Sequence, residues 1–577
     1  MEKYQLGTWD LSEIKPLSIE LAKKSVEQKT KSFESKRKFL TTTISNSLFL
    51  SLVKELELLR QETEKLAVYV QLKFSEDSAN QKALAEMSQV ENFLTKTGNR
   101  LLFFSLWFKQ LPDQKMKQLI KASGKYRYYF ASLRRTKKYT LKENEEKIIN
   151  LKDTTGVSAL NNIYNIFTSS FSYQFQGKNR TQEEMITFVR SDKASVREQA
   201  YRMLLKPFQE HKMIIGEAYK NIINDWREEN VFLRGYSNPI NARNVANDLP
   251  DKAVEMLLRV IRENQYLFQK FFEIKRKKLG LKRFRRFDLY APLEPEKEII
   301  SYDAAVKLVL ETFEQFSPYF VNAARNILNQ KHVHSTVQKG KRSGAFCCPA
   351  TTNHAPYVLL SYTGKFRDVS TLAHELGHGV HMTLSQKQTE FTMDACLPLA
   401  ETASIFSEML LSEQMMKLNP RAAKQMIFTK LDDLYASIIR QAGFIEFEKK
   451  AHEMIKDGRT TDEISAVYLT DLRKQLGPKV IVDDLFAYEW TYIPHIFHTP
   501  FYCYAYAFGN LLTLALYEMY KEKGPAFAER IVEMLSKGGS ESPVEITKAI
   551  GVDITSEQFW QKGFEAIKQM IDLVDDN

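Results

Sequence analysis

The sequence predicts a mainly α-helical protein. Long amphipathic stretches with few Pro or Gly residues run over 47–72, 81–94, 113–133 and 251–278, and their apolar residues recur with the helical period. The hydrophobic content of 44% is enough for a substantial core in a chain of 577 residues, which by its length can hold two or more domains. These observations favour a large helical protein with a well-packed interior.

A polar break in the chain suggests how it divides. The run Gln-Gly-Lys-Asn-Arg at 176–180 interrupts the helical pattern. We therefore place an approximate boundary there, with an N-terminal helical lobe over 1–190 and a second lobe over 191–577.

A small β-sheet is expected near the middle of the chain. Residues 344–348 and 356–362 read as two short strands separated by a polar turn. An edge strand can pair with an extended peptide through main-chain hydrogen bonds, which makes Gly344, Ala345 and Val358 candidate substrate contacts. A hairpin that only packs under the next helix fits the same pattern.

The strongest chemical signal is the pentapeptide His374-Glu-Leu-Gly-His378. Two histidines four residues apart share one face of a helix, so both imidazoles can bind one metal ion, and Glu375 lies beside it as a potential base. Because only 10 of the 577 residues are His, the odds of a chance match are about one in a hundred. The pattern predicts a zinc hydrolase site.

The segment around this motif itself reads as a helix. Leu372, Leu376 and Val380 form an apolar row, and Asp368 or Ser370 is available as the N-cap. Gly377 costs the helix about 1 kcal/mol, which a purely structural helix has little reason to accept. We expect the missing side chain to leave space beside the metal.

A zinc site needs a third protein ligand, and two residues compete for that role. His381 shares the helical face, but it lies roughly 10 Å along the axis from His374, too far for a rigid helix to bring all three imidazoles to one ion. Glu401 is favoured, with Glu408 on the same face of a second helix to hold a ligand histidine from behind. Taken alone, Glu401 also fits a glutamate favoured by the dipole at a helix N-terminus.

The chain resembles a known family in several motifs. His374-Glu-Leu-Gly-His378 followed by Glu401-Thr-Ala-Ser looks like the M3 family of zinc oligopeptidases, in its oligoendopeptidase F branch. Further matching stretches are Trp-Asp-Leu-Ser at 9–12, Leu-Arg-Gly-Tyr-Ser at 233–237, Gly-Lys-Arg-Ser-Gly-Ala-Phe at 340–346, Pro-Tyr-Val-Leu-Leu at 356–360, 492–502, 538–543 and 551–554. The resemblance spans essentially the whole chain.

The resemblance implies a fold and a ligand set. The expected fold is two helical lobes that enclose a deep substrate channel, with the small sheet beside the zinc helix. By match of motif, one Zn²⁺ ion is bound by His374, His378 and Glu401, and Glu375 is the general base. Glu408 and His381 would support the ligands.

The segment 495–506 holds two histidines and three tyrosines, which can donate hydrogen bonds to an oxyanion. The family uses a histidine and tyrosines from this part of the chain to bind the scissile carbonyl and the substrate backbone. His495 matches that histidine, and either Tyr502 or Tyr504 is the catalytic tyrosine. His498 and Tyr506 are expected to contact substrate, although a cap for His498 and a core position for Tyr506 fit equally well.

The resemblance implies a zinc-dependent oligoendopeptidase that acts on short unfolded peptides. Zinc lowers the pKa of a bound water towards about 7, and Glu375 takes a proton as that water attacks the peptide carbonyl. A zinc exopeptidase of the carboxypeptidase kind remains an alternative, as does an inactive peptide-binding protein. The intact Glu375 argues against the second alternative, since binding alone needs no base.

Composition bears on the partners and the compartment. The net charge is +11, but apolar residues interrupt the basic runs at 275–278 and 282–286, so we expect solvated basic faces and no nucleic-acid partner. Four cysteines without paired spacing favour a reducing compartment. No apolar run is long enough for a signal core or a membrane span, so we expect a cytoplasmic protein with no membrane partner.

Overall fold

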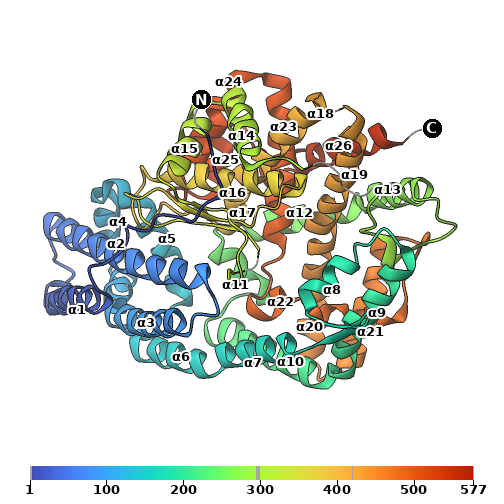
Figure 1. The fold of residues 1–577 in the computed structure, drawn as a ribbon. Coiled ribbons are helices and arrows are strands. Elements are labelled where there is room, and N and C mark those ends of the chain that lie inside the picture. Colours follow the sequence, from blue (N-terminus) through green and yellow to red (C-terminus); the bar gives the residue numbers. More distant parts are fainter. Residues whose placement is uncertain (1–2, 294–298, 343, 419, 576–577) are drawn as a thin grey trace. The chain divides into compact units, whose positions relative to one another are not determined.

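The computed structural model describes residues 3–293, 299–342, 344–418 and 420–575. Helices dominate this structure and the sheets are small, which confirms the predicted mainly α class (Figure 1). None of the helices in these ranges has the length and apolar content that a bilayer span requires.

The chain forms two compact units, each assembled from three segments. Unit 1 comprises Met1–Lys147, Lys297–Gln414 and Met519–Val552, and unit 2 comprises Ile148–Glu296, Met415–Glu518 and Asp553–Asn577. This division differs from the single boundary expected near residue 190. A polar break marks where a helix ends, whereas a compact unit is defined by which segments pack together, and those segments lie far apart in the sequence here.

The helices and strands that lie wholly within unit 1 come from all three of its segments. They are α1 (Ile19–Ser35), α2 (Asn46–Glu76), α3 (Gln81–Gln110), α4 (Asp113–Ala122), α5 (Arg127–Arg135), α14 (Tyr302–Phe316), α15 (Pro318–Asn329), β4 (Val333–His334), β5 (Phe346–Cys348), β6 (Tyr357–Leu359), α16 (Phe366–Ser385), α17 (Leu397–Ala400), α24 (Pro525–Leu535) and α25 (Pro543–Ala549). The bounds of α6 (Glu143–Thr155), α18 (Thr402–Leu418) and α23 (Tyr504–Lys523) include residues of both units.

Unit 2 is also mainly helical. It contains α7 (Val157–Ser169), β1 (Tyr173–Phe175), β2 (Lys178–Arg180), α8 (Gln182–Phe188), α9 (Ala194–Glu210), α10 (Lys212–Arg227), α11 (Pro239–Ala246), α12 (Asp251–Glu263), α13 (Gln265–Lys278), β3 (Phe284–Arg285), α19 (Pro420–Leu434), α20 (Gln441–Lys456), α21 (Thr461–Leu476), β7 (Val480–Ile481), α22 (Pro494–His498) and α26 (Glu557–Val574).

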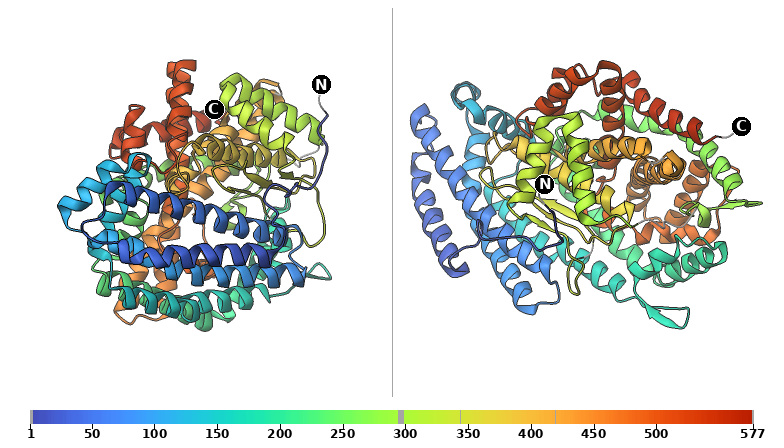
Figure 2. Two further views of the ribbon diagram at one scale, coloured as in Figure 1. Left: turned by 90° about the vertical axis from the view of Figure 1, so that its left-hand side faces the viewer. Right: turned by 45° about the horizontal axis from the view of Figure 1, so that its top comes forward.

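The first three helices of unit 1 pack side by side, as both views of Figure 2 show. Ser18, Ser45 and Asn80 accept hydrogen bonds from the first turns of α1, α2 and α3, so each helix begins at a side-chain cap. Phe49 of α2 and Phe104 of α3 are buried in the aromatic core between them. This core fixes α2 and α3 as a rigid wall of unit 1.

The three-stranded sheet has the order β4-β6-β5, so of the two strands that the sequence predicts, β5 is an edge strand and β6 is central. The strand β6 is parallel to β4 and antiparallel to β5. Both β5 and β6 pack against α16, and the sheet therefore lies directly beside the helix that carries the His-Glu-x-x-His motif.

Candidate metal centre

The helix α16 presents its motif because its other face is buried. Leu372, Leu376 and Val380 are fully buried, as the predicted apolar row requires, and the helix packs against α14 and α15. Asp368 is not the N-cap residue. The helix begins at Phe366 after the N-cap Lys365, and the Asp368 carboxylate accepts the N–H of Lys365 at 3.2 Å. This contact caps the first turn from inside the helix.

The structure brings together the three predicted ligands. The Oε2 atom of Glu401 lies 3.5 Å from Nε2 of His374 and 3.3 Å from Nε2 of His378, and the three ligand atoms all lie within 4.8 Å of one another. Ligand atoms at about 2.1 Å from a tetrahedral zinc ion are about 3.4 Å apart. The spacing of this donor set therefore fits one zinc ion.

The carboxylate of Glu408 orients His374. Its Oε1 atom lies 2.5 Å from Nδ1 of the imidazole, so Nδ1 donates to the carboxylate and Nε2 is left to face Glu401. Burial alone would lower the pKa of His374, but the hydrogen bond to Glu408 and the negative charges of Glu408, Glu375 and Glu401 together outweigh it and raise that pKa to about 9. The expected supporting role of Glu408 thus has a direct contact behind it.

The ligand Glu401 is held as a carboxylate. Burial would raise its pKa, but the hydrogen bond from His378 and the charges of both histidines lower it to about 2. Ser404 donates its hydroxyl to the same Oε2 atom at 3.0 Å. Glu401 lies between α17, which ends at Ala400, and α18, which begins at Thr402. The sequence suggests one continuous helix here, whereas the structure has two helices that meet at this ligand.

The role of Gly377 differs from the expected one. A Cβ at this position would lie 2.7 Å from the Cα of Ser404 and 2.8 Å from the carbonyl oxygen of Ala403. The missing side chain therefore admits the backbone of α18 and does not serve to clear space beside the metal. The close approach of α16 and α18 is what brings Glu401 and Glu408 to the histidines.

The general base candidate, Glu375, points into the same pocket. Its side chain is only 5% exposed, and burial raises its pKa despite the neighbouring His374 and His378. Within the described part of the chain, its Oε2 atom is buried without a hydrogen-bond partner. A buried carboxylate with raised proton affinity and one unpartnered oxygen is suited to exchange a proton with a reacting group.

The pocket around Glu375 has a volume of about 440 Å³ and includes residues from β5. Ala345 lines it, as do Phe346 and Cys347, while Gly344 precedes them with φ of +81°, which suits glycine. Val358 does not line this pocket. It is fully buried in the central strand β6 and donates its N–H to the carbonyl of His332, which contradicts the expectation that it contacts substrate.

His381 lies in the same pocket without joining the ligand set. Its side chain is 6% exposed, and burial lowers its pKa to about 4. The imidazole hydrogen-bonds to the backbone of Ala400, the residue before Glu401. This contact agrees with a supporting role close to a ligand.

The predicted histidine and tyrosines of 495–506 belong to unit 2 and form a cluster there. The ring of His495 stacks parallel to Tyr502 with centroids 6.1 Å apart, and the Tyr506 hydroxyl lies 3.4 Å from Nε2 of His495. Tyr504 is fully buried, and its hydroxyl accepts a hydrogen bond from Asn247 at 2.7 Å. These contacts contradict the expectation that Tyr504 is catalytic. His498 is exposed and bonded to Asn165.

The residue before Tyr502 has an unusual backbone that sequence reasoning missed. Phe501 has φ of +57°, and its N–H donates to Oε1 of Glu448 at 2.8 Å. Complete burial raises the pKa of Glu448 to about 8, although this hydrogen bond lowers it. A glutamate within the apolar face of α20 was the available signal, because a buried carboxyl group needs a partner.

A second acidic group in unit 2 can also hold a cation. Asp153, Asp225 and Glu229 lie close enough to share one ion, but they offer only carboxylates, and such exposed groups are common without a metal. Imidazole ligands favour zinc, so the His374, His378 and Glu401 set is the better zinc site.

A helix-borne His-Glu-x-x-His pair with a glutamate from the next helix defines a site of the metallopeptidase class. The profile of Peptidase family M3 matches residues 187–566, and the chain belongs to this family. The profile named Oligopeptidase F matches residues 107–173. Both matches agree with the resemblance found in the motifs.

Similar proteins cover the whole chain. An oligoendopeptidase F homolog of Borreliella burgdorferi is 28% identical over 95% of this chain and 94% of its own length. Group B oligopeptidase PepB of Streptococcus agalactiae is 24% identical over 99% of this chain and 96% of its own. Among solved structures, oligoendopeptidase-F from Enterococcus faecium has a TM-score of 0.74 at 20% identity, covering 96% of this chain and 97% of that chain. PZ peptidase A with an inhibitor has a TM-score of 0.80 at 19% identity, covering 98% and 100%.

We expect Gly377→Ala to weaken both folding and metal binding. The added methyl group would meet the α18 backbone, and overpacking of this kind costs about 1–3 kcal/mol. Gly98→Ala is the matched control, because a Cβ at Gly98 in α3 meets nothing within 4 Å and Ala favours the helix. Thermal midpoints and zinc affinities of both variants check this. An unchanged zinc affinity in Gly377→Ala would refute the role given to the helix contact.

We expect Glu408→Gln to lower zinc affinity about 10- to 100-fold, because loss of a carboxylate behind a ligand histidine typically has that effect. Competition with a chromophoric chelator measures the affinity directly. The exposed Glu311→Gln variant on α14 removes the same charge and should bind zinc as the native protein does. Equal affinities for both variants would contradict the orienting role.

We expect Glu448 to make the stability of the protein fall as pH rises from about 4 to 8. Its pKa is about 8 in the folded protein, against about 4.3 in an unfolded chain, so the folded state keeps a proton that the unfolded state releases in this window. Glu448→Gln cannot ionise. Its thermal midpoint relative to the native protein should therefore be higher at pH 8.5 than at pH 5.5. The exposed Glu453→Gln on the same helix is the control, and a pH-independent difference for Glu448→Gln would exclude this effect.

Proposed function

We propose that this M3 peptidase is a zinc-dependent oligoendopeptidase that hydrolyses internal bonds of short unfolded peptides. The observation that carries the proposal is a single pocket in which His374, His378 and Glu401 fit a zinc ion and Glu375 offers a buried base. The similar proteins named oligoendopeptidase F support the same activity.

The donor set supports zinc over the other common ions. Two imidazole nitrogens and one carboxylate are the ligands of many catalytic zinc sites, whereas Mg²⁺ and Ca²⁺ prefer oxygen ligands throughout. When bound, zinc supplies a Lewis acid that polarises a carbonyl and lowers the pKa of water to about 7. Glu408 and Ser404 hold the donors in place through the contacts described above.

Proton transfer is assigned to Glu375. A carboxylate that burial makes more basic accepts a proton from the attacking water more readily than an exposed one. The same group can then return the proton to the leaving amine, because the protonated form is also favoured by burial. His381 keeps a neutral imidazole beside it, since burial lowers its pKa to about 4, and so does not compete for the proton at neutral pH.

Substrate binding is assigned in part to the edge strand β5. Ala345 reaches the pocket of Glu375, and the outer edge of β5 is not paired within the sheet. An extended peptide can add to such an edge through main-chain hydrogen bonds, with little dependence on its sequence. We retain Gly344 and Ala345 as proposed contacts.

The cluster of His495, Tyr502 and Tyr506 is proposed to bind the substrate carbonyl and backbone. The support is the family resemblance together with the shared packing of these three rings in unit 2. Tyr506 replaces Tyr504 in this assignment, because the Tyr504 hydroxyl is buried against Asn247. Loss of one oxyanion donor typically costs about 100- to 1000-fold in rate.

Endopeptidase activity is favoured over carboxypeptidase activity by the lining of the zinc pocket. A carboxypeptidase needs a cation that binds the terminal carboxylate, and no Lys or Arg is among the described residues that line this pocket. We further propose a cytoplasmic location, because the four cysteines form no disulfide in the described structure.

We expect the native protein to cut internal bonds of peptides blocked at both ends. Mass spectrometry of a blocked peptide mixture, with and without a chelator, measures this directly. Glu375→Gln should bind zinc yet lose activity by about 1000-fold or more, because the base is gone while the ligands remain. If the zinc-loaded native protein leaves blocked peptides intact but shortens free ones from an end, the endopeptidase proposal fails in favour of an exopeptidase.

A further inference from the structure

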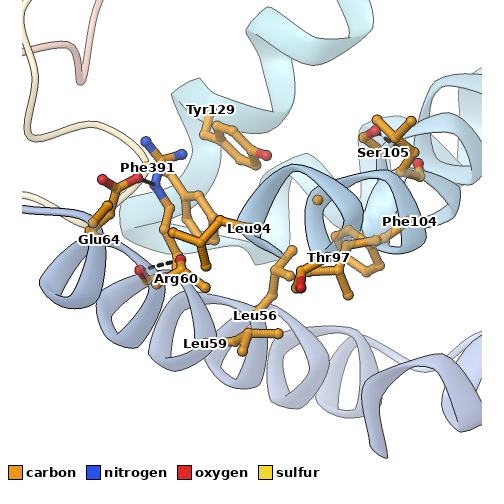
Figure 3. A pocket seen from close by; sticks show the side chains of 15 residues that line it. Leu56, Leu59, Arg60, Glu64, Leu94, Thr97, Phe104, Ser105, Tyr129 and Phe391 are labelled. Carbon is orange, nitrogen blue, oxygen red and sulfur yellow. Dashed lines mark hydrogen bonds and ion pairs between the residues drawn. The ribbon is translucent and has the colours of Figure 1, made fainter. Parts of the chain in front are cut away.

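A second pocket of unit 1 lies between α2, α3, α5 and the segment that follows α16. Its volume is about 360 Å³, and its walls are mostly apolar. Figure 3 shows Leu56, Leu59 and Leu94 along its length, with Glu64, Arg60 and Phe391 towards one end and Phe104 towards the other. Such a cavity has the size and lining to take one large apolar side chain.

A glycine lies in the wall of this pocket. Gly98 lies inside the 30-residue helix α3, where glycine costs about 1 kcal/mol relative to alanine. Its backbone does not require glycine, because φ is not positive, and a Cβ there would meet nothing within 4 Å. The wall at Gly98 therefore faces open space, and a large side chain placed at this position can reduce the space in the pocket.

One short segment of the chain lines both this pocket and the pocket of the zinc site. Phe391 lines the apolar pocket, and Met393, Asp394 and Ala395 line the pocket of Glu375. Two residues of chain span at most about 7 Å, so the two pockets are neighbours within unit 1. Phe391 is fixed there by Tyr129, whose ring stacks on it at 4.5 Å.

The charges at this end of the pocket select against acidic groups. Burial raises the pKa of Glu64, and the nearby Asp394 raises it further, while Arg60 opposes them from 3.9 Å. The Arg60 guanidinium also lies over the Phe391 ring, 5.7 Å from its centroid. With two carboxylates against one guanidinium, an acidic side chain entering from the zinc site meets net repulsion.

We propose that this apolar pocket binds an apolar side chain of a peptide whose scissile bond lies at the zinc centre. The inference rests on the proposed peptidase function and adds a specificity site to it. The wall residues Phe391 and Met393 of the two pockets are two positions apart in the chain, and an extended peptide advances about 3.3 Å per residue, so a few substrate residues are enough to pass from one pocket towards the other. Peptides too short to reach the pocket lose this contribution, so the site also favours substrates of sufficient length.

The test uses a set of end-blocked peptides with one common cleavage site. A single position is varied among Leu, Ser and Asp, and is moved from two to six residues from the scissile bond on either side. We expect one position at which Leu is preferred to Ser by about 10-fold or more in kcat/KM, with Asp the poorest. Binding of the same peptides to Glu375→Gln, measured by fluorescence anisotropy, gives a readout that does not need catalysis.

Gly98→Phe places a large side chain in the pocket wall, at a position where a Cβ meets nothing within 4 Å. We expect it to abolish the preference for Leu, both in kcat/KM and in binding to Glu375→Gln, while the Ser peptide and a short peptide are cut at the native rate. Gly98→Ala is the matched control, because it also replaces the glycine with a better helix former but adds only a methyl group, and it should keep the preference.

The outcomes separate the two proposals. Cleavage with no preferred position, or a preference that survives Gly98→Phe, overturns the specificity pocket and leaves the peptidase function intact. Absence of cleavage by the zinc-loaded protein, together with a Leu preference in binding that Gly98→Phe removes, supports the pocket and overturns the peptidase function.

Discussion

The site depends on one contact between two helix backbones. At Gly377, α16 and α18 approach so closely that a single methyl group would overlap the Cα of Ser404. Because of this approach, Glu401 before the contact and Glu408 after it both reach the imidazole of His374. Packing of two helices at ordinary distances of 8–10 Å would leave these carboxylates short of their partners. The chemistry of the centre is therefore set by a steric condition one turn away from it.

The sequence predicts the centre better than it predicts its surroundings. The spacing of His374 and His378 follows from helix geometry alone, and Glu401 and Glu408 follow from a shared face and a family motif. The reason for glycine at position 377 could not be predicted, because the atoms that exclude a side chain there belong to α18. Only the packing of the folded chain brings α18 so close. Tertiary packing also decides which tyrosine is accessible, since it buries Tyr504 against a distant asparagine.

The fold shows the same limit. Periodicity predicts the helices and the two short strands, because both patterns are local properties of the chain, whereas the pairing with β4 decides which of the two strands lies at the edge. Val358 was assigned to substrate by the same pattern, but β4 pairs with its strand from the other side and removes it from access. The division into two units was also beyond a local reading, since each unit collects three separate segments.

Electrostatics explains why such a centre takes a cation. Glu375, Glu401 and Glu408 lie around two imidazoles, and the hydrogen bond to Glu408 together with these charges raises the pKa of His374 despite its burial, whereas the pKa of Glu375 is raised chiefly by burial. A field that stabilises an imidazolium also stabilises a divalent ion at the same ligand atoms, so proton and metal compete for His374. Because the whole protein carries a net charge of +11, the negative field at the site cannot come from the overall charge. It comes from the carboxylates that α16, α18 and the residue before α18 place there. The contact of the two helices at Gly377 therefore sets the geometry of the site and gathers the carboxylates whose negative charge favours a cation there.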